Sequence, residues 1–213
     1  MHNQHRFFFA VRLSPEAAAM AREVAGQQMA RYGLPGRPID AERLHITLHW
    51  LGDYDHVPQE LVRCAMYVES RIELGPFNVG FDRVGSFEGD APGGLALTST
   101  VQLKSLGLLQ RAVGKEMRTA GIGQLVRSRF NPHVTLVYKS PPVPCEPIAP
   151  ICWPVNELVL IHSYVGLGKH VDLGNWPLPD RQLRLDLSPS SGGAMTDSNC
   201  PRDGQDFPLG DQP

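Results

Sequence analysis

Residues 44–50, Leu-His-Ile-Thr-Leu-His-Trp, and residues 132–138, Pro-His-Val-Thr-Leu-Val-Tyr, decide how this chain folds. Both read His, apolar, Thr, Leu, and the second histidine follows the first by 88 positions. Side chains alternate between the two faces of an extended strand, so His45 and Thr47 are predicted to share one face. His133 and Thr135 are predicted to do the same. Apolar residues on the opposite face would anchor each strand, so we expect the two strands to line one cleft.

The segments before the two motifs predict a repeated unit. In the first half, an apolar run at residues 6–13 is typical of a central strand, and Ser14-Pro15 opens a helix expected over residues 15–31. In the second half, a strand at 94–98 precedes a helix at 101–120. Each unit then ends in a motif strand. The fold class predicted is α+β and bilobal, with two antiparallel sheets facing a central cleft, helices outside and an internal pseudo-twofold duplication.

The remaining segments complete this outline. We expect a helix at 58–72, a half-buried strand at 77–82, a proline-rich loop at 141–154 and a closing strand pair at 157–162 and 169–176. Residues 188–213 are rich in Ser, Gly, Asp and Pro, and they have too few large apolar groups to offset their ordering entropy. The prediction is one bilobal domain, 1–187, followed by a disordered tail, 188–213.

Composition excludes several classes of protein. The chain has 213 residues, 42% of them apolar, and a net charge of −2 with a pI near 6.4, so no broad basic field attracts long nucleic acids. Its four cysteines show no C-x-x-C spacing, and the apolar run at 7–11 is too short for a signal peptide or a membrane span. We therefore expect a cytoplasmic protein without a membrane partner, and a monomer.

Several sequence blocks carry a resemblance to a known family. Besides the motifs, these are RFFFAVRLS at 6–14, HITLHWLGD at 45–53, FNPHVTLVYK at 130–139 and LVLIHSYV at 158–165. Together they resemble the two-histidine (2H) phosphoesterase superfamily and, within it, the LigT-type RNA 2′,3′-cyclic phosphodiesterases, also called 2′-5′ RNA ligases. The resemblance implies hydrolysis of a terminal 2′,3′-cyclic phosphate to a 2′-phosphate without a metal or another cofactor. The expected partner is RNA with such an end, or a small cyclic nucleotide.

The resemblance also implies residue roles. His45 and His133 match the catalytic pair, and Thr47 and Thr135 match the phosphate-binding hydroxyls. Opening a cyclic phosphodiester needs a base for water and an acid for the leaving oxygen, and histidine titrates near neutral pH. We expect His45 to act as the acid and His133 as the base, with the threonines donating hydrogen bonds to phosphate oxygens.

One position departs from the family pattern. Asn131 stands directly before the Pro of the second motif, where the family often has Arg. Arg129 or Arg127 is therefore a candidate for the phosphate or RNA contact, although a solvated connector explains both equally well. His49, on the predicted face of His45, is a further possible RNA contact; the competing view is a surface histidine.

The residues around the motifs allow further roles. A zinc site of His45, His49 and His133 is disfavoured, because His49 lies about 13 Å along the strand from His45 at roughly 3.3 Å per residue. Phe9 or Tyr138 could stack on a base, but core packing is favoured for both. His162 and His170 have no partner motif and are expected to be structural or on the surface. The same site could also join RNA ends as a ligase, or bind nucleotides without turnover.

Overall fold

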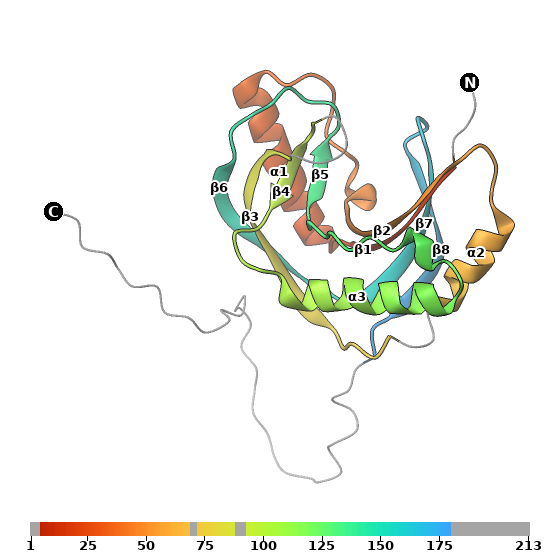
Figure 1. Ribbon diagram of the computed structural model, residues 1–213. Helices are drawn as coiled ribbons and strands as arrows, with labels where there is room; N and C mark the ends of the chain where they lie inside the picture. Colours follow the sequence, from red (N-terminus) through yellow and green to blue (C-terminus); the bar gives the residue numbers. More distant parts are fainter. Residues whose placement is uncertain (1–4, 69–71, 88–92, 180–213) are drawn as a thin grey trace, which may run out of the picture.

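Two four-stranded antiparallel sheets make up the strands of the described residues (Figure 1). The structure is a computed structural model that describes residues 5–68, 72–87 and 93–179. In sheet A the strand order is β2-β1-β7-β8, and in sheet B it is β5-β4-β3-β6. The strands of sheet A are β1 (His5–Arg12), β2 (His45–Tyr54), β7 (Glu157–Tyr164) and β8 (Lys169–Pro177), and those of sheet B are β3 (Phe77–Ser86), β4 (Leu95–Thr98), β5 (Val134–Val137) and β6 (Glu146–Val155). The predicted fold class is confirmed.

The two sheets repeat one topology. In sheet A, β1 leads through helix α1 (Pro15–Tyr32) to β2, and in sheet B, β4 leads through helix α3 (Lys104–Thr119) to β5. In both cases the strand after the helix lies at the edge of its sheet, next to the strand before the helix. The motif strands are therefore the two equivalent edge strands, and β2 and β5 contact each other where the sheets meet.

Helices α1 and α3 each pack against the sheet of the other half of the chain. Helix α1 contacts β5 and β6 of sheet B, with the Tyr32 hydroxyl donating to Glu146 over 2.6 Å, whereas α3 contacts β2 of sheet A. One continuous core cluster accordingly includes Phe7 and Phe9 of sheet A together with Phe81 and Trp153 of sheet B. This exchange ties the two halves into one unit around a shared core.

Helix α1 begins and ends as its sequence predicts. The Ser14 side chain accepts a hydrogen bond from the Ala17 N–H at 3.2 Å, and Pro15 occupies the first turn. At the other end Gly33 adopts φ 60°, and its N–H bonds the Met29 carbonyl. The helix ends at Tyr32, one residue beyond the predicted boundary.

The prediction of a loop at 141–154 is wrong, because β6 occupies most of this segment. Prolines at 147, 150 and 154 suggested irregular structure, since proline cannot donate to a sheet ladder. However, β6 pairs only with β3 and forms the edge of sheet B, where one side needs no ladder donors. Edge position thus reconciles the prolines with a strand.

Some predicted boundaries shift or lie beyond the described residues. Helix α2 covers only Gln59–Met66, and α3 begins at Lys104 rather than at residue 101. The predicted tail, 188–213, and the predicted domain end at 187 lie outside the described residues. No helix in the described part of the chain is long and apolar enough to cross a membrane.

Candidate active site

Strand pairing places the first pair of motif residues on one face of its sheet. His45 lies opposite Arg12, and Thr47 lies opposite Ala10. Directly opposite residues of an antiparallel pair project to the same side. Ala10 and Phe8 belong to a small apolar cluster separate from the main core. The site therefore lies on the face of sheet A that the main core does not fill.

The second motif is built in the same way. Thr135 lies opposite Ala96 of β4, just as Thr47 lies opposite Ala10 of β1. His133 comes directly before β5 and is half-buried, as His45 is. The two halves thus present equivalent histidine and threonine positions.

A β-bulge follows the threonine in both motifs. In β2 the pairing passes from Thr47 opposite Ala10 to His49 opposite Phe9, which leaves Leu48 as the extra residue. In β5 it passes from Thr135 to Val137, which leaves Leu136 as the extra residue. A bulge moves the side chains that follow it to the opposite face until the next irregularity, which in β2 comes at Leu51. The two halves therefore share the bulge as well as the motif residues.

The bulge overturns the prediction for His49. This side chain turns into the core with only 1% of its surface exposed, and its Nε2 lies 2.8 Å from the Gln110 carbonyl of α3. It cannot contact RNA from there, and the set of His45, His49 and His133 cannot converge on a metal. Strict alternation would place Trp50 on the face opposite His45, but Trp50 lies opposite Phe8 on the face of His45 and is 39% exposed.

The two aromatic residues considered for base stacking lie in different environments. Phe9 is fully buried in the main core, as favoured from the sequence. Tyr138, which follows the second bulge as Trp50 follows the first, is 53% exposed, so the expected core packing of Tyr138 is wrong. An exposed aromatic side chain therefore follows the bulge in both halves.

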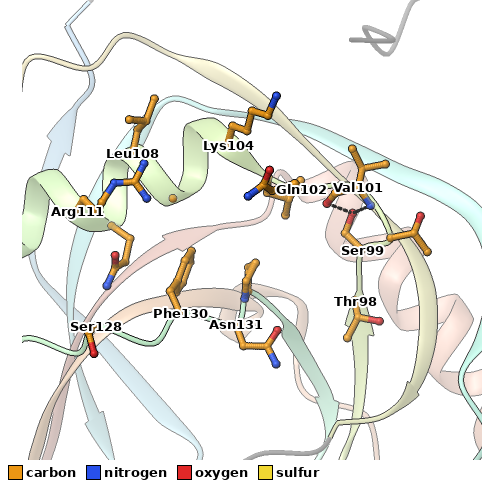
Figure 2. Close-up of a pocket in the computed structure, with 15 residues that line it drawn as sticks. Thr98, Ser99, Val101, Gln102, Lys104, Leu108, Arg111, Ser128, Phe130 and Asn131 are labelled. Atoms are coloured by element: carbon orange, nitrogen blue, oxygen red, sulfur yellow. Dashed lines mark hydrogen bonds between the residues drawn. The ribbon is translucent and has the colours of Figure 1, made fainter. Parts of the chain in front are cut away.

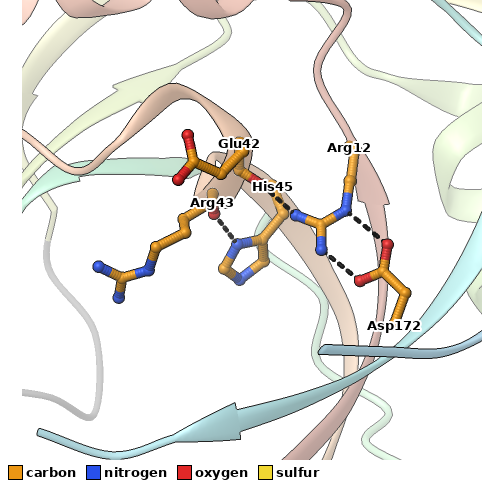
Figure 3. Close-up of polar contacts among 5 residues, drawn as sticks. All are labelled: Arg12, Glu42, Arg43, His45 and Asp172. Atoms are coloured by element: carbon orange, nitrogen blue, oxygen red, sulfur yellow. Dashed lines mark hydrogen bonds and ion pairs between the residues drawn. The ribbon is translucent and has the colours of Figure 1, made fainter. Parts of the chain in front are cut away.

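The imidazole of His45 is held in one orientation. Its Nδ1 lies 2.6 Å from the Arg43 carbonyl (Figure 3). Its ring stacks on Phe8 with centroids 4.7 Å apart. Because a carbonyl can only accept, Nδ1 must carry the proton. The remaining nitrogen, Nε2, is then the atom that can give or take a proton during a reaction.

His133 repeats this arrangement. Its Nδ1 lies 3.0 Å from the carbonyl of Asn131, again two residues earlier, and its ring stacks on Phe87 with centroids 3.8 Å apart. The same reasoning assigns the proton to Nδ1 and leaves Nε2 available. Two imidazoles with the same tautomer therefore occupy equivalent places in the two halves.

Both catalytic candidates are neutral at pH 7 in the ligand-free protein. Burial lowers the pKa of His45 to about 4; the bond to the Arg43 carbonyl opposes the shift, and the charge of Arg12 adds to it. Burial also lowers the pKa of His133, opposed by its bond to Asn131. Strand β2, which begins at His45, and strand β5, which follows His133, contact each other where the two sheets meet.

The two threonine hydroxyls are available to a ligand. Thr47 and Thr135 are half-buried, and neither side chain has a hydrogen-bond partner among residues 5–68, 72–87 and 93–179. A hydroxyl without a partner can donate to an incoming oxygen without first breaking another bond. Both lie two residues after a histidine on the same face of their strand.

His170 also belongs to this site, although no motif marked it. Its ring centroid lies 5.5 Å from that of His45 in an edge-on contact. Burial lowers the pKa of His170 to about 3, and the charges of His45, Arg43 and Arg12 add to the shift. The prediction of a structural or surface role did not anticipate this contact, because β8 is at the far edge of sheet A and no sequence spacing relates the two histidines.

The cationic residues divide into two groups. Arg127, predicted as a possible RNA contact, places its guanidinium carbon 5.8 Å from the ring centroid of Trp50, whereas Arg129 is exposed and has no ion pair within the described ranges. Arg12, which lies opposite His45, donates hydrogen bonds to Asp172 and to the Glu42 carbonyl (Figure 3). Sequence reasoning missed Arg12, which belongs to an apolar strand run.

A cavity of about 790 Å³ adjoins the second motif (Figure 2). It lies between the start of α3 and the connector that ends in Asn131 and Pro132. Lys104 and Arg111 line it from the helix side, and Phe130 lines it from the connector. Its position beside His133 gives space for a group attached to a phosphate held at the motifs.

Among the residues that the structure describes, no group of three or more His, Cys, Asp and Glu side chains is arranged to hold a metal ion. The groups that the site presents to a ligand are its imidazoles, hydroxyls and cationic side chains.

Comparisons with known proteins agree with this geometry. The model of a family described as the 2′-5′ RNA ligase superfamily matches residues 13–166. The apo structure of LigT from E. coli has a TM-score of 0.63 at 21% identity, covering 82% of this chain and 98% of that one. E. coli LigT complexed with ATP gives 0.64 at 25% identity, covering 83% and 99%. TT0787 of Thermus thermophilus gives 0.66 at 22% identity, covering 81% and 97%. No curated protein matches the chain.

Proposed function

The chain belongs to the 2′-5′ RNA ligase superfamily, and on that premise we propose that it hydrolyses the terminal 2′,3′-cyclic phosphate of RNA to a 2′-phosphate. The observation that carries the proposal is the repeated geometry of His45 and His133. Each imidazole fixes its Nδ1 proton on the carbonyl two residues earlier and keeps Nε2 for chemistry.

The reaction uses one imidazole on each side of phosphorus. Nε2 of His133 takes a proton from water as the water oxygen bonds to phosphorus. The bond between phosphorus and the 3′-oxygen breaks, and protonated Nε2 of His45 gives its proton to that oxygen. The ribose keeps the phosphate on its 2′-oxygen, and proton transfer from His133 to His45 through water restores the starting state. No step needs a metal.

Charge from the substrate prepares His45 for its role as the acid. In the free protein its pKa is about 4, mainly because of burial, so it is neutral near pH 7. An anionic phosphate next to the ring favours the imidazolium and raises the pKa. Substrate binding and protonation of His45 are therefore coupled, and the acid is formed where it is needed.

Thr47 and Thr135 stabilise the charge on phosphorus. Their unengaged hydroxyls, one from each motif, donate to the two non-bridging oxygens, whose negative charge grows in the transition state. Because each threonine faces the same side as its histidine, the four groups can surround one phosphate.

The rest of the RNA contacts the exposed aromatic and basic side chains near the motifs. Trp50 offers a ring for a base, and Arg127, which already stacks over that ring, offers charge for a phosphate. Arg129 is the second candidate for the phosphate contact. E. coli LigT has been solved with ATP, which supports a nucleotide as ligand. We expect the protein to act in the cytoplasm as a monomer.

The decisive test uses a short RNA with a 2′,3′-cyclic end. The purified protein, with EDTA present, should convert it to a product whose phosphate resists 3′-specific phosphatases, which identifies a 2′-phosphate. His45→Ala and His133→Ala should each lower the rate by about 10²–10⁴-fold. A 3′-phosphate product would reverse the assignment of the leaving oxygen, and full activity in both variants would end the two-histidine mechanism.

A second arm separates hydrolase from ligase. An RNA with a 5′-hydroxyl is added in excess, and joined product is measured beside hydrolysis. The same two histidines in the same roles would catalyse joining, with the 5′-hydroxyl attacking phosphorus in place of water, so product ratio rather than mutagenesis distinguishes the two reactions. Tight binding of the cyclic end without any product would instead indicate a nucleotide-binding module.

A further inference from the structure

A second pocket lies between Glu42 and Arg43, just before His45, and the start of β8. It has a volume of about 490 Å³ and is lined by Arg12, Glu42, Arg43, Gly168, Lys169, His170 and Asp172. The contact between His170 and His45, with centroids 5.5 Å apart, makes this pocket the direct neighbour of the reacting site. None of the roles described above uses it.

The pocket has a net positive charge, because three cations, Arg12, Arg43 and Lys169, line it together with two carboxylates, Glu42 and Asp172. Asp172 is already engaged by the guanidinium of Arg12. Lys169 has no carboxylate partner within the described ranges and lies 5.5 Å from the ring centroid of Tyr164. The charge of Lys169 and that of Arg43 therefore remain available to an anion.

Arg43 is largely buried with weak charge compensation. Its side chain is only 17% exposed, yet its one ion pair within the described residues, with Asp40, is long at 4.0 Å. Its buried Nε has no partner in the described part of the chain, and neither does the buried Nδ1 of His170. Burying a charge without compensation is costly, and unpartnered buried polar atoms in native proteins often belong to ligand sites. The protein thus keeps a largely buried guanidinium ready for a ligand.

The other half of the duplication lacks this feature. The position that corresponds to Arg43, two residues before the motif histidine, is Asn131. Thr98 ends β4 where Arg12 ends β1. The half that carries His45 therefore has cations where the other half has neutral residues, so the two sides of the site differ in charge.

We propose that this pocket binds a second phosphate group of the substrate, in addition to the phosphate that reacts between the two histidines. The inference rests on the proposed function and deepens it, because it selects substrates with a phosphate beyond the cyclic one. Two sources share this chemistry: a 5′-phosphate on a single nucleotide, and the phosphodiester that joins the terminal nucleotide to the RNA.

Matched substrates test the proposal. The kcat/KM is compared for a nucleoside 2′,3′-cyclic phosphate, for the same nucleotide with a 5′-phosphate, and for a dinucleotide with a cyclic end. We expect at least about a tenfold preference for the substrates with the added phosphate, since one charge-assisted contact corresponds to that factor or more. A gain only with the 5′-phosphate identifies a terminal phosphate as the ligand, and an equal gain with the dinucleotide identifies the chain phosphate.

Variants locate the preference. Arg43→Gln and Lys169→Gln should each bring the ratio toward one, whereas Lys115→Gln, on the exposed face of α3, should keep it. If Arg43→Gln does not fold, Lys169→Gln alone decides, since Lys169 is exposed. An unchanged ratio in the folded pocket variants, or no preference in the wild type, overturns the proposal.

A binding measurement tests the second-phosphate pocket separately from the proposed hydrolase activity. Calorimetric titrations compare a nucleoside 3′-phosphate with the corresponding 3′,5′-bisphosphate. Tighter binding of the bisphosphate that Arg43→Gln removes supports the pocket even if no cyclic phosphate is hydrolysed. Equal affinities would reject the pocket while leaving the hydrolase proposal untouched.

Discussion

The rings of His45 and His170 lie 5.5 Å apart although they stand on β2 and β8, the opposite edges of sheet A. Two edge strands can bring side chains of one face together only if the sheet curls toward that face. Phe8, with its ring 4.7 Å from His45 and 5.8 Å from His170, lies between them on the central strand. The curl therefore removes water from both imidazoles, and this burial is the main cause of their low pKa values.

Acid should destabilise the fold through these two histidines. Their pKa values in the folded protein are about 4 and about 3, below the value near 6.5 expected in the unfolded chain. The unfolded state then binds more protons, so stability is full above about pH 6.5 and falls as the pH drops toward 4. We expect a loss of several kcal/mol over this range by urea unfolding, since one pKa unit corresponds to about 1.4 kcal/mol. The His170→Phe variant should lose clearly less unfolding free energy over the same pH range. An equal pH dependence in this variant would contradict the curled arrangement.

Activity should show a related shift. The kcat/KM reports the free enzyme, in which burial lowers the pKa of both His45 and His133. Because the acid loses its proton at lower pH when its pKa is lowered, the falling limb of kcat/KM should lie below pH 6.5. The limb of kcat reports the complex, where the substrate phosphate raises the pKa, and should lie at higher pH. Superimposable limbs would mean that substrate charge does not prepare the acid.

The threonine hydroxyls should act on the transition state alone. Thr47→Val and Thr135→Val keep the shape of the side chain and remove the donor, so each should lower kcat by about 10²–10³-fold. Thr→Ser at either position retains the donor and should keep most of the activity. Melting temperatures should barely change, because neither hydroxyl has a partner within the described residues. A large loss of stability in the valine variants would assign the hydroxyls a structural role instead.

Much of this architecture is visible in the sequence, and the comparisons confirm the family resemblance that the motifs carry. The apolar run of β1, the Ser14-Pro15 start of α1 and the motif strands follow from local periodicity and capping. The strand β6 does not, because the tolerance of an edge for Pro147 and Pro154 depends on the final strand order. The bulges at Leu48 and Leu136 are also invisible to strict alternation, since nothing in the residue types marks where a ladder skips. His170 reaches the site only through the curl of the whole sheet.

His45 and His49 should respond oppositely to the same substitution. His49 is 1% exposed and bonds the Gln110 carbonyl, so His49→Ala leaves a cavity, removes this hydrogen bond and should cost about 2–4 kcal/mol of unfolding free energy. At a temperature where it is folded, its kcat/KM should stay within a few-fold of wild type. His45→Ala should show the reverse, a stable fold without activity. If His49→Ala is as stable as wild type and as inactive as His45→Ala, the bulge does not turn His49 away from the substrate.

Trp50 and Arg127 should matter for RNA and little for small substrates. Base stacking on an aromatic ring is worth about 1–3 kcal/mol, so Trp50→Ala should raise KM for a cyclic-ended oligonucleotide by roughly 5–100-fold. Trp50→Phe keeps an aromatic surface and should restore most of that loss. Arg127→Gln should weaken oligonucleotide binding and reduce its salt dependence, because one cation no longer releases counterions from the phosphates. Arg129→Gln is the matched comparison, exposed on the same connector without a partner in the described ranges. A stronger effect of Arg129→Gln than of Arg127→Gln would assign the contact to Arg129. If Trp50→Ala raises KM equally for a cyclic mononucleotide, Trp50 contacts the reacting nucleotide rather than the rest of the RNA.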